Sequence, residues 1–358
     1  MAQKRNEASH IIIGNLTLQN PIICASSDAV MSAKAIRAVL SSGVAGVVAK
    51  SINESPQAAE QLNFADFVAL NPNLDVIPWS SPLPSDASLF GRSGLGQIKP
   101  ADWMKVLGLL DAEAKQAGQF VAGSIILGGD EGCLAIVEHA NKARLRVLEI
   151  SIGAPHAEEA THGAISAIRE EDRVYRFVQR VRQSTDMQLW IKLSGHNADV
   201  AALSVAVQQA GAQAVVLTTR FMAMLPDPET MMPVLGTAAA YGGRWALPIT
   251  CRLLSQTRKK VGPAYPLIGS NGARSGLDAV RMMLAGASAV QFASGVMMGG
   301  TKALADAIFE VESYLARKAT YASAIVGKAA DVVTRYQDQS NVPGKWKEFL
   351  PPELAGDD

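Results

Sequence analysis

The chain has 358 residues, 48% hydrophobic and 18% charged, so it can bury a large core. Its 33 basic residues balance 33 acidic ones, so no net field favours nucleic acid or a membrane surface, and a small-molecule substrate is expected. The three cysteines, Cys24, Cys133 and Cys251, are too few and too scattered for a disulfide framework, an iron–sulfur cluster or a metal site. The N-terminus is polar and no apolar run is long enough to cross a membrane. These features predict a cytoplasmic protein without a membrane anchor.

The chain opens with a predicted β-hairpin. Residues 11–13 and 16–18 are apolar and flank Gly14 and Asn15, which tolerate the left-handed backbone of a tight turn. A buried strand at 21–25, a helix at about 32–42 and a second strand at 46–49 follow. The hairpin is expected to cap one end of the domain.

Strand and helix patterns alternate along the rest of the chain. Further strands are predicted at 120–126, 146–150, 188–193, 214–217, 267–269 and 289–292. Helices are predicted at 102–117, 132–142, 170–183, 199–209, 275–285 and 301–316. Eight strands in strict alternation with helices predict the α/β class and a closed (β/α)8 TIM barrel, since no early glycine fingerprint favours an open sheet. We expect one domain over residues 1–336 and a C-terminal tail over 337–358.

Two connections, at 51–100 and 219–244, are too long for simple loops. Each follows the carboxyl end of a predicted strand, where barrel enzymes build substrate pockets. The first contains Pro78, Pro82 and Pro84, which predict an ordered but irregular excursion. These segments are the expected strand-end insertions.

Two glycine-rich turns predict a phosphate site. Residues 267–276 and 286–295 each place small side chains between a late strand and a helix, so backbone N–H groups can approach an anion. Phosphate binding after the last two strands is common in such barrels, and two turns at this spacing favour it over plain tight turns.

Lys50 and Lys192 end or interrupt apolar strands, where a charge is costly without a partner. Lys192 could form a Schiff base, as in aldolase-type barrels, or donate to the electron-rich edge of a flavin. A rim salt bridge is the alternative interpretation of Lys50.

Several motifs, taken in order, resemble the dihydroorotate dehydrogenase family. They are NPIICAS (20–26), VAKS (48–51), GLG (94–96), EISIGAPH (149–156), IKL (191–193), YGG (241–243) and the two glycine turns. The similarity covers most of residues 11–318, and Pro155 with His156 is closer to the dihydropyrimidine dehydrogenase branch. The ordered set is strong evidence for a barrel that binds FMN.

The resemblance implies a set of cofactor contacts. Lys50 would approach the redox edge of the flavin, and Lys192 would face its pyrimidine side. The other expected flavin contacts are Ala25, Ser26, Ser51 and Ser151. The phosphate would be held around Ser270, Asn271, Gly272, Ala293 and Ser294, mostly through backbone N–H groups.

The substrate side departs from the family. The family carries a Cys or Ser before the motif's proline, whereas this chain has Ala154, which cannot exchange a proton. The positions of the family's substrate-binding asparagines hold Gly91, Ser151, His156 and Thr219. A site built to grip an amide edge loses discrimination without those partners, so dihydroorotate is not the expected substrate.

Other side chains are candidates for the missing roles. His156 is the first choice for proton transfer, with His162 and His196 as further candidates, because an imidazole titrates near neutral pH. Substrate contacts are expected from the strand-end connections, where arginines suit an anionic group. The candidates are Gly91, Arg92, Ser93, Gly94, Thr219, Arg220 and Arg244.

The resemblance thus implies an FMN-dependent oxidoreductase that moves a hydride between flavin and a CH–CH or C=C bond of a small cyclic or conjugated substrate. Two alternatives stay open: a Schiff-base lyase or aldolase built on Lys192 that acts on a phosphorylated substrate, and a flavin-binding protein without turnover. We also expect a homodimer. The electron partner stays open: a fumarate-like acceptor, a quinone, oxygen or a separate electron-transfer partner could each serve.

Overall fold

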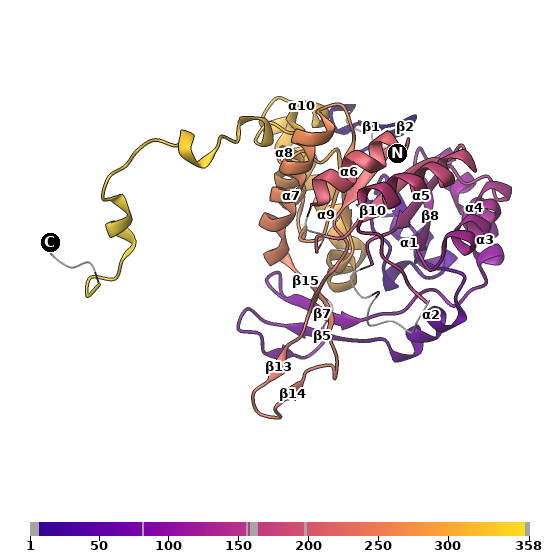
Figure 1. Ribbon diagram of the computed structural model, residues 1–358, viewed down its shortest axis with the longest axis horizontal. Helices are drawn as coiled ribbons and strands as arrows, with labels where there is room; N and C mark the ends of the chain where they lie inside the picture. Colours follow the sequence, from indigo (N-terminus) through magenta and orange to yellow (C-terminus); the bar gives the residue numbers. More distant parts are fainter. Residues whose placement is uncertain (1–6, 81, 155–156, 158–163, 197–198, 355–358) are drawn as a thin grey trace.

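Eight parallel strands close into a barrel in the computed structural model, which describes residues 7–80, 82–154, 157, 164–196 and 199–354 (Figure 1). The strands are β3 (Ile22–Cys24), β4 (Gly46–Val48), β8 (Phe120–Ile126), β9 (Val147–Ser151), β10 (Gln188–Leu193), β11 (Ala214–Leu217), β16 (Leu267–Ser270) and β17 (Ala289–Phe292). They pair in chain order, and β17 pairs with β3 to close the ring. The predicted (β/α)8 TIM barrel is confirmed.

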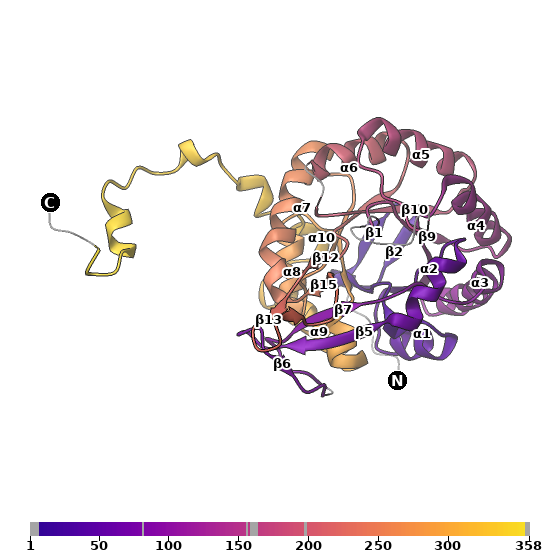
Figure 2. The ribbon, with the colours of Figure 1, turned by 60° about the horizontal axis from the view of Figure 1, so that its bottom comes forward.

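Helices surround the barrel (Figure 2). They are α1 (Ala33–Leu40), α3 (Pro100–Gln116), α4 (Asp130–Lys142), α5 (Glu171–Gln183), α6 (Val200–Gln209), α7 (Leu247–Val261), α8 (Gly276–Leu284) and α9 (Ser294–Arg317). Helix α9 starts earlier than predicted, but Gly300 at φ 65° interrupts it, so the predicted start at residue 301 matches its second segment. Helix α7 was not predicted, because Thr250 and Thr257 on its buried face dilute the apolar periodicity.

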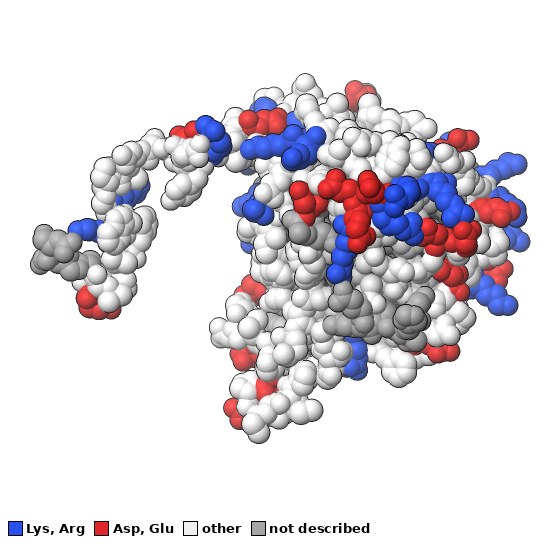
Figure 3. All heavy atoms as spheres, viewed as in Figure 1, with Lys and Arg blue, Asp and Glu red and all other residues white. Residues whose placement is uncertain are grey.

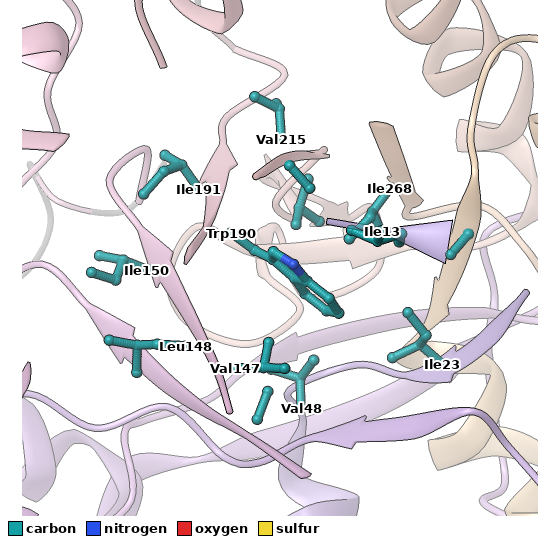
Figure 4. Close-up of a cluster of buried hydrophobic side chains, with 14 of the residues drawn as sticks. Ile13, Ile23, Val48, Val147, Leu148, Ile150, Trp190, Ile191, Val215 and Ile268 are labelled. Carbon is teal, nitrogen blue, oxygen red and sulfur yellow. The ribbon is translucent and has the colours of Figure 1, made fainter. Parts of the chain in front are cut away.

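Packed side chains fill the barrel interior. Figure 4 shows the indole of Trp190 among aliphatic side chains that include Ile23 and Val48. Trp190 is fully buried, and Phe120 packs against it edge to face with ring centroids 5.3 Å apart. The barrel is therefore a solid core, and any site must lie at one of its ends.

The N-terminal hairpin lies at the amino-terminal end of the barrel strands. Strands β1 (Ile11–Ile13) and β2 (Leu16–Leu18) pair as predicted. Gln188, the first residue of β10, donates a hydrogen bond to the side-chain oxygen of Asn15 at 2.8 Å. The carboxyl ends of the strands are left for the site.

The two long insertions combine into one antiparallel sheet beside the barrel (Figure 2). The first contributes β5 (Asp66–Leu70), β6 (Val76–Ile77) and β7 (Ser88–Arg92), after α2 (Pro56–Glu60). The second contributes β12 (Phe221–Ala223) and β15 (Ala239–Gly242), and the small hairpin β13 (Pro226–Asp227) and β14 (Met232–Pro233). The sheet order is β12-β15-β7-β5-β6. The prediction of an irregular first insertion was wrong, because its strand β7 pairs with β15 from the distant second insertion.

Two peripheral segments carry exposed apolar side chains. The β13–β14 hairpin forms a lobe with few charged residues, at the lower left of Figure 3, on which Met231 is 85% exposed. Beyond α10 (Ala322–Ile325), the tail forms three short 3-10 turns and runs away from the barrel (yellow in Figure 1), and most of its side chains are exposed. Within the described ranges, no helix is both long enough and apolar enough to cross a membrane.

Asp111 supplies a stability prediction, because its buried carboxylate joins helix α3 to two strands. It accepts hydrogen bonds from Val121 N at 2.9 Å and from Arg146 Nη2 at 2.7 Å. Asp111→Ala should lower the free energy of unfolding by about 2–3 kcal/mol, since the Val121 N–H loses its acceptor and Arg146 loses its carboxylate while keeping Gln119 O. Urea unfolding measures this loss.

The matched control is Glu113→Ala on the same helix. Glu113 pairs with Arg37, and both side chains are more than half exposed, so solvent screens the pair. We expect little change in stability for this variant. Equal losses for the two variants would contradict the role given to Asp111.

Candidate functional site

A cavity opens at the carboxyl ends of the barrel strands, with about 1150 Å³ of empty space including its open mouth. Strand-end residues form its floor and sides, and Phe67, Leu89 and Gly242 of the five-stranded sheet form a further wall. Its size suits a cofactor together with a small substrate. Most of the predicted site residues line it: Ser26, Lys50, Ser51, Gly91, Ser93, Gly94, Ser151, Lys192, Thr219, Arg220, Ser270, Asn271, Gly272, Ala293 and Ser294.

Four other predicted residues do not line the cavity. Ala25 is buried, and its N–H donates to Phe292 O at 2.9 Å. Arg92 donates to backbone carbonyls. Arg244 pairs with Asp278 at 3.1 Å.

His196 is the fourth, and it is exposed. Its Nε2 accepts a hydrogen bond from Met222 N at 3.0 Å, and its ring packs on Phe221. His156 and His162 lie outside the described residues.

A closed polar network lies at the floor of the cavity. Lys192 Nζ is 3.2 Å from Glu149 Oε1 and 2.8 Å from Gln291 Oε1. Gln291 Nε2 donates to the other oxygen of Glu149 at 2.5 Å. The three side chains are almost fully buried. The Glu149 carboxylate therefore balances the charge of Lys192, whose partner could not be identified from the sequence.

Glu149 and Gln291 were missed as site residues. Their signal was a polar residue inside an apolar strand, the same signal that singled out Lys192.

Ser26 and Ser51 line one side of the cavity, and the buried Ser124 supports them from behind. Ser51 Oγ lies 2.9 Å from Ser26 Oγ and 2.8 Å from Ser124 Oγ. Ser51 N also donates to Ser26 Oγ at 3.0 Å, which fixes the two strand ends relative to each other. Ser124 was not predicted, because one serine in a strand carries no distinguishing pattern.

Lys50 belongs to a second charged cluster, nearer the five-stranded sheet. Its Nζ is 3.0 Å from Asp28 Oδ1 and 2.8 Å from Ser93 Oγ, and Ser93 donates to the same carboxylate. Burial lowers the pKa of the Lys50 ammonium, Arg220 lowers it further by like-charge repulsion, and Asp28 opposes both. Asp28 was missed because nothing in the sequence separates it from an ordinary loop aspartate.

The glycine turn after β16 forms the opposite end of the cavity. Asn271 and Gly272 both have positive φ, of 74° and 107°, a backbone in which successive N–H groups can face an anion. An ideal Cβ on Gly272 would lie 2.5 Å from Leu247 N, so the turn packs directly on the start of α7. This turn and the floor network fit the phosphate and ring of FMN.

Cys24 lies in β3 below the site and is fully buried. Burial raises the pKa of its thiol to about 12, so it stays protonated at neutral pH and is not a nucleophile.

Comparisons with known proteins agree with this architecture. The family model described as "Dihydroorotate dehydrogenase" matches residues 129–315. The Pyrococcus furiosus protein named "Dihydroorotate dehydrogenase B (NAD(+)), catalytic subunit" is 26% identical over 301 residues, covering 84% of this chain and 91% of the relative. The Methanocella arvoryzae protein of the same name is 25% identical over 322 residues, covering 89% of this chain and 97% of the relative.

Proposed function

The chain belongs to the dihydroorotate dehydrogenase family of FMN-binding oxidoreductases, and from that premise we propose that it acts on a CH–CH or C=C bond of a small cyclic or conjugated substrate other than dihydroorotate. The main support for the proposal is that one cavity is lined both by the positive-φ turn of Asn271 and Gly272, which suits a phosphate, and by Lys192, whose charge is balanced by Glu149.

We assign cofactor binding to two groups of residues. The backbone around Asn271 and Gly272, with Ser270, Ala293 and Ser294, would hold the phosphate of FMN. Lys192 would face the flavin ring with Ser26, Lys50, Ser51 and Ser151 around it. FMN supplies reversible hydride chemistry when bound. The protein binds and orients both partners and excludes water.

Lys192 has a role other than imine formation in this proposal. Its Nζ is held by Glu149 and Gln291, and membership of a flavoprotein family favours the flavin contact over the aldolase alternative. Borohydride reduction should therefore trap no carbonyl substrate on Lys192.

The departure from dihydroorotate rests on the cavity lining. Gly91, Ser151 and Thr219 line the cavity but offer no amide side chain, and among the described lining residues Asn271 is the one asparagine. Ala154 also lines the cavity and has no proton to exchange. We keep His156 as the proposed proton partner, with His162 as the second choice.

Partners form the last part of the proposal. The Pyrococcus furiosus and Methanocella arvoryzae relatives are named as catalytic subunits of an NAD(+)-type enzyme, so we propose that a separate electron-transfer protein serves this chain. Its three cysteines lie far apart in the sequence, which leaves no iron–sulfur relay within it. The proposed homodimer can be checked by sedimentation.

The visible spectrum followed by anaerobic titration tests the proposal. The purified or FMN-reconstituted protein should show flavin bands, and a reduced cyclic substrate from a panel of dihydropyrimidines and related compounds should bleach them. Dihydroorotate should bleach them at least about 100-fold more slowly, because its amide and carboxylate lack their partners. Failure to bind FMN would refute the proposal, and bound flavin that no compound in the panel reduces would favour the non-catalytic alternative.

A further inference from the structure

A second pocket opens beside the main cavity, beneath the five-stranded sheet, and we call it the side pocket. It holds about 630 Å³ of empty space including its mouth. Gly91, Ser93, Arg220 and Ala240 line both the side pocket and the main cavity, so the two spaces are neighbours that share part of their walls. Arg220 therefore borders both spaces.

The charged side chains that the structure describes around the main cavity are paired, with one exception. Lys192 is paired with Glu149, and Lys50 with Asp28. Arg220 is partly buried, and within the described part of the chain its guanidinium has no hydrogen-bond or ion-pair partner. Among the described residues that line the main cavity, Arg220 is thus the one charged side chain without a contacting partner.

The side pocket supplies no carboxylate to compensate that charge. Its described lining contains no aspartate or glutamate. Its other cation, Arg92, is used by the fold, since it donates to Phe64 O at 2.7 Å and lies 3.7 Å from Asp66. Among the described lining residues, Arg220 is therefore the cation of the side pocket that is free to bind an anionic ligand.

A guanidinium that lines a pocket without a protein acceptor keeps its N–H donors available to a ligand, and partial burial of its charge favours a counter-ion. Burial lowers the pKa of Arg220, and only Asp28 opposes this. Lys50 is close enough for mutual repulsion. A bound anion would relieve both costs, and a planar guanidinium suits a carboxylate or a phosphate.

We propose that the side pocket is an anion subsite in which Arg220 binds a carboxylate or phosphate group on a tail of the substrate. This subsite proposal rests on the proposed function in one respect, which is that the reacting ring of the substrate lies in the main cavity. The subsite is distinct from the turn at Asn271 and Gly272, which we assign to the cofactor phosphate.

Calorimetry with simple probes on the FMN-loaded protein tests the subsite. Benzoate and benzamide have nearly the same shape but differ in charge, and phenyl phosphate presents the other anion. The wild-type protein should bind benzoate or phenyl phosphate at least about 10-fold more tightly than benzamide. The tighter of the two identifies the tail chemistry.

Substitution of Arg220 assigns the effect to that residue. Arg220→Gln should weaken binding of the preferred anion by about 10- to 100-fold and leave benzamide unchanged, while Arg220→Lys should recover part of the loss. The matched control is Arg252→Gln, which removes an exposed arginine on α7 and should change neither. Flavin content and thermal midpoint verify that each variant is folded.

Two results would overturn the subsite. The first is that the wild-type protein binds neither anion more tightly than benzamide, a result that requires no variant. The other is anion binding that survives Arg220→Gln in a folded, flavin-loaded variant. Neither result depends on turnover, so a failure here is distinct from failure of the proposed oxidoreductase activity, which the flavin titration reports.

Discussion

Lys192→Met is expected to lower the free energy of unfolding of the flavin-free protein by about 3–5 kcal/mol, because it leaves a buried carboxylate without its cation. Glu149 is 1% exposed, and Lys192 is its ion-pair partner at 3.2 Å. After the substitution, the donor that remains is Gln291 Nε2. Urea unfolding measures the loss, and weaker FMN binding should accompany it.

A double-mutant cycle is the control for this prediction. Glu149→Gln alone should also destabilise the protein, since it leaves Lys192 buried beside a neutral amide. The double variant has no buried charge at the floor, so its loss should be smaller than the sum of the single losses by at least about 2 kcal/mol. Additive losses would show that the two charges do not depend on each other.

Gly272→Val is expected to weaken FMN binding by at least about 100-fold and to lower the free energy of unfolding by at least about 3 kcal/mol. Gly272 has φ 107°, and an added Cβ would lie 2.5 Å from Leu247 N and 2.7 Å from Leu247 Cα. These are backbone atoms at the start of α7, so the collision can be relieved only by moving the turn or the helix. Titration of apoprotein with FMN, followed by flavin fluorescence, measures the affinity.

Gly236→Val is the control that separates the effect of the steric collision in Gly272→Val from the effect of backbone strain. Gly236 also has a positive φ, of 72°, but an added Cβ would meet no atom within 4 Å. Gly236→Val should therefore cost only the strain, about 1–2 kcal/mol, and leave FMN affinity unchanged. If Gly272→Val bound FMN as tightly as Gly236→Val, the turn would not be the phosphate site.

The barrel could be predicted from the sequence because its signals are local. Buried strands such as β8 and β10 are mostly apolar runs, and the apolar residues of the amphipathic helices between them recur every three to four positions. The five-stranded sheet could not be predicted in the same way. Its central pair, β7 and β15, joins two insertions far apart in the chain, and no local pattern encodes that contact.

The residues of the candidate site also fall into those that a local sequence pattern predicted and those that only the structure identified. Lys192 stood out in the sequence because a charge inside an apolar strand is costly, and the glycine turns stood out by composition. Arg220 was one of several strand-end arginines predicted to contact an anionic substrate, and the sequence did not separate it from Arg92 and Arg244. Asp28 was not predicted at all, since charged loop residues are usually solvated.

The sequence by itself determined the barrel, the FMN family and the lysines, because periodicity, composition and motif order are properties of neighbouring residues. Only the tertiary structure decided which charges are compensated. An ion pair depends on two atoms that lie a few ångströms apart in space, although their residues are far apart in the sequence. The tertiary structure paired Lys192 with Glu149 and Lys50 with Asp28, and it left Arg220 without a partner in the described structure.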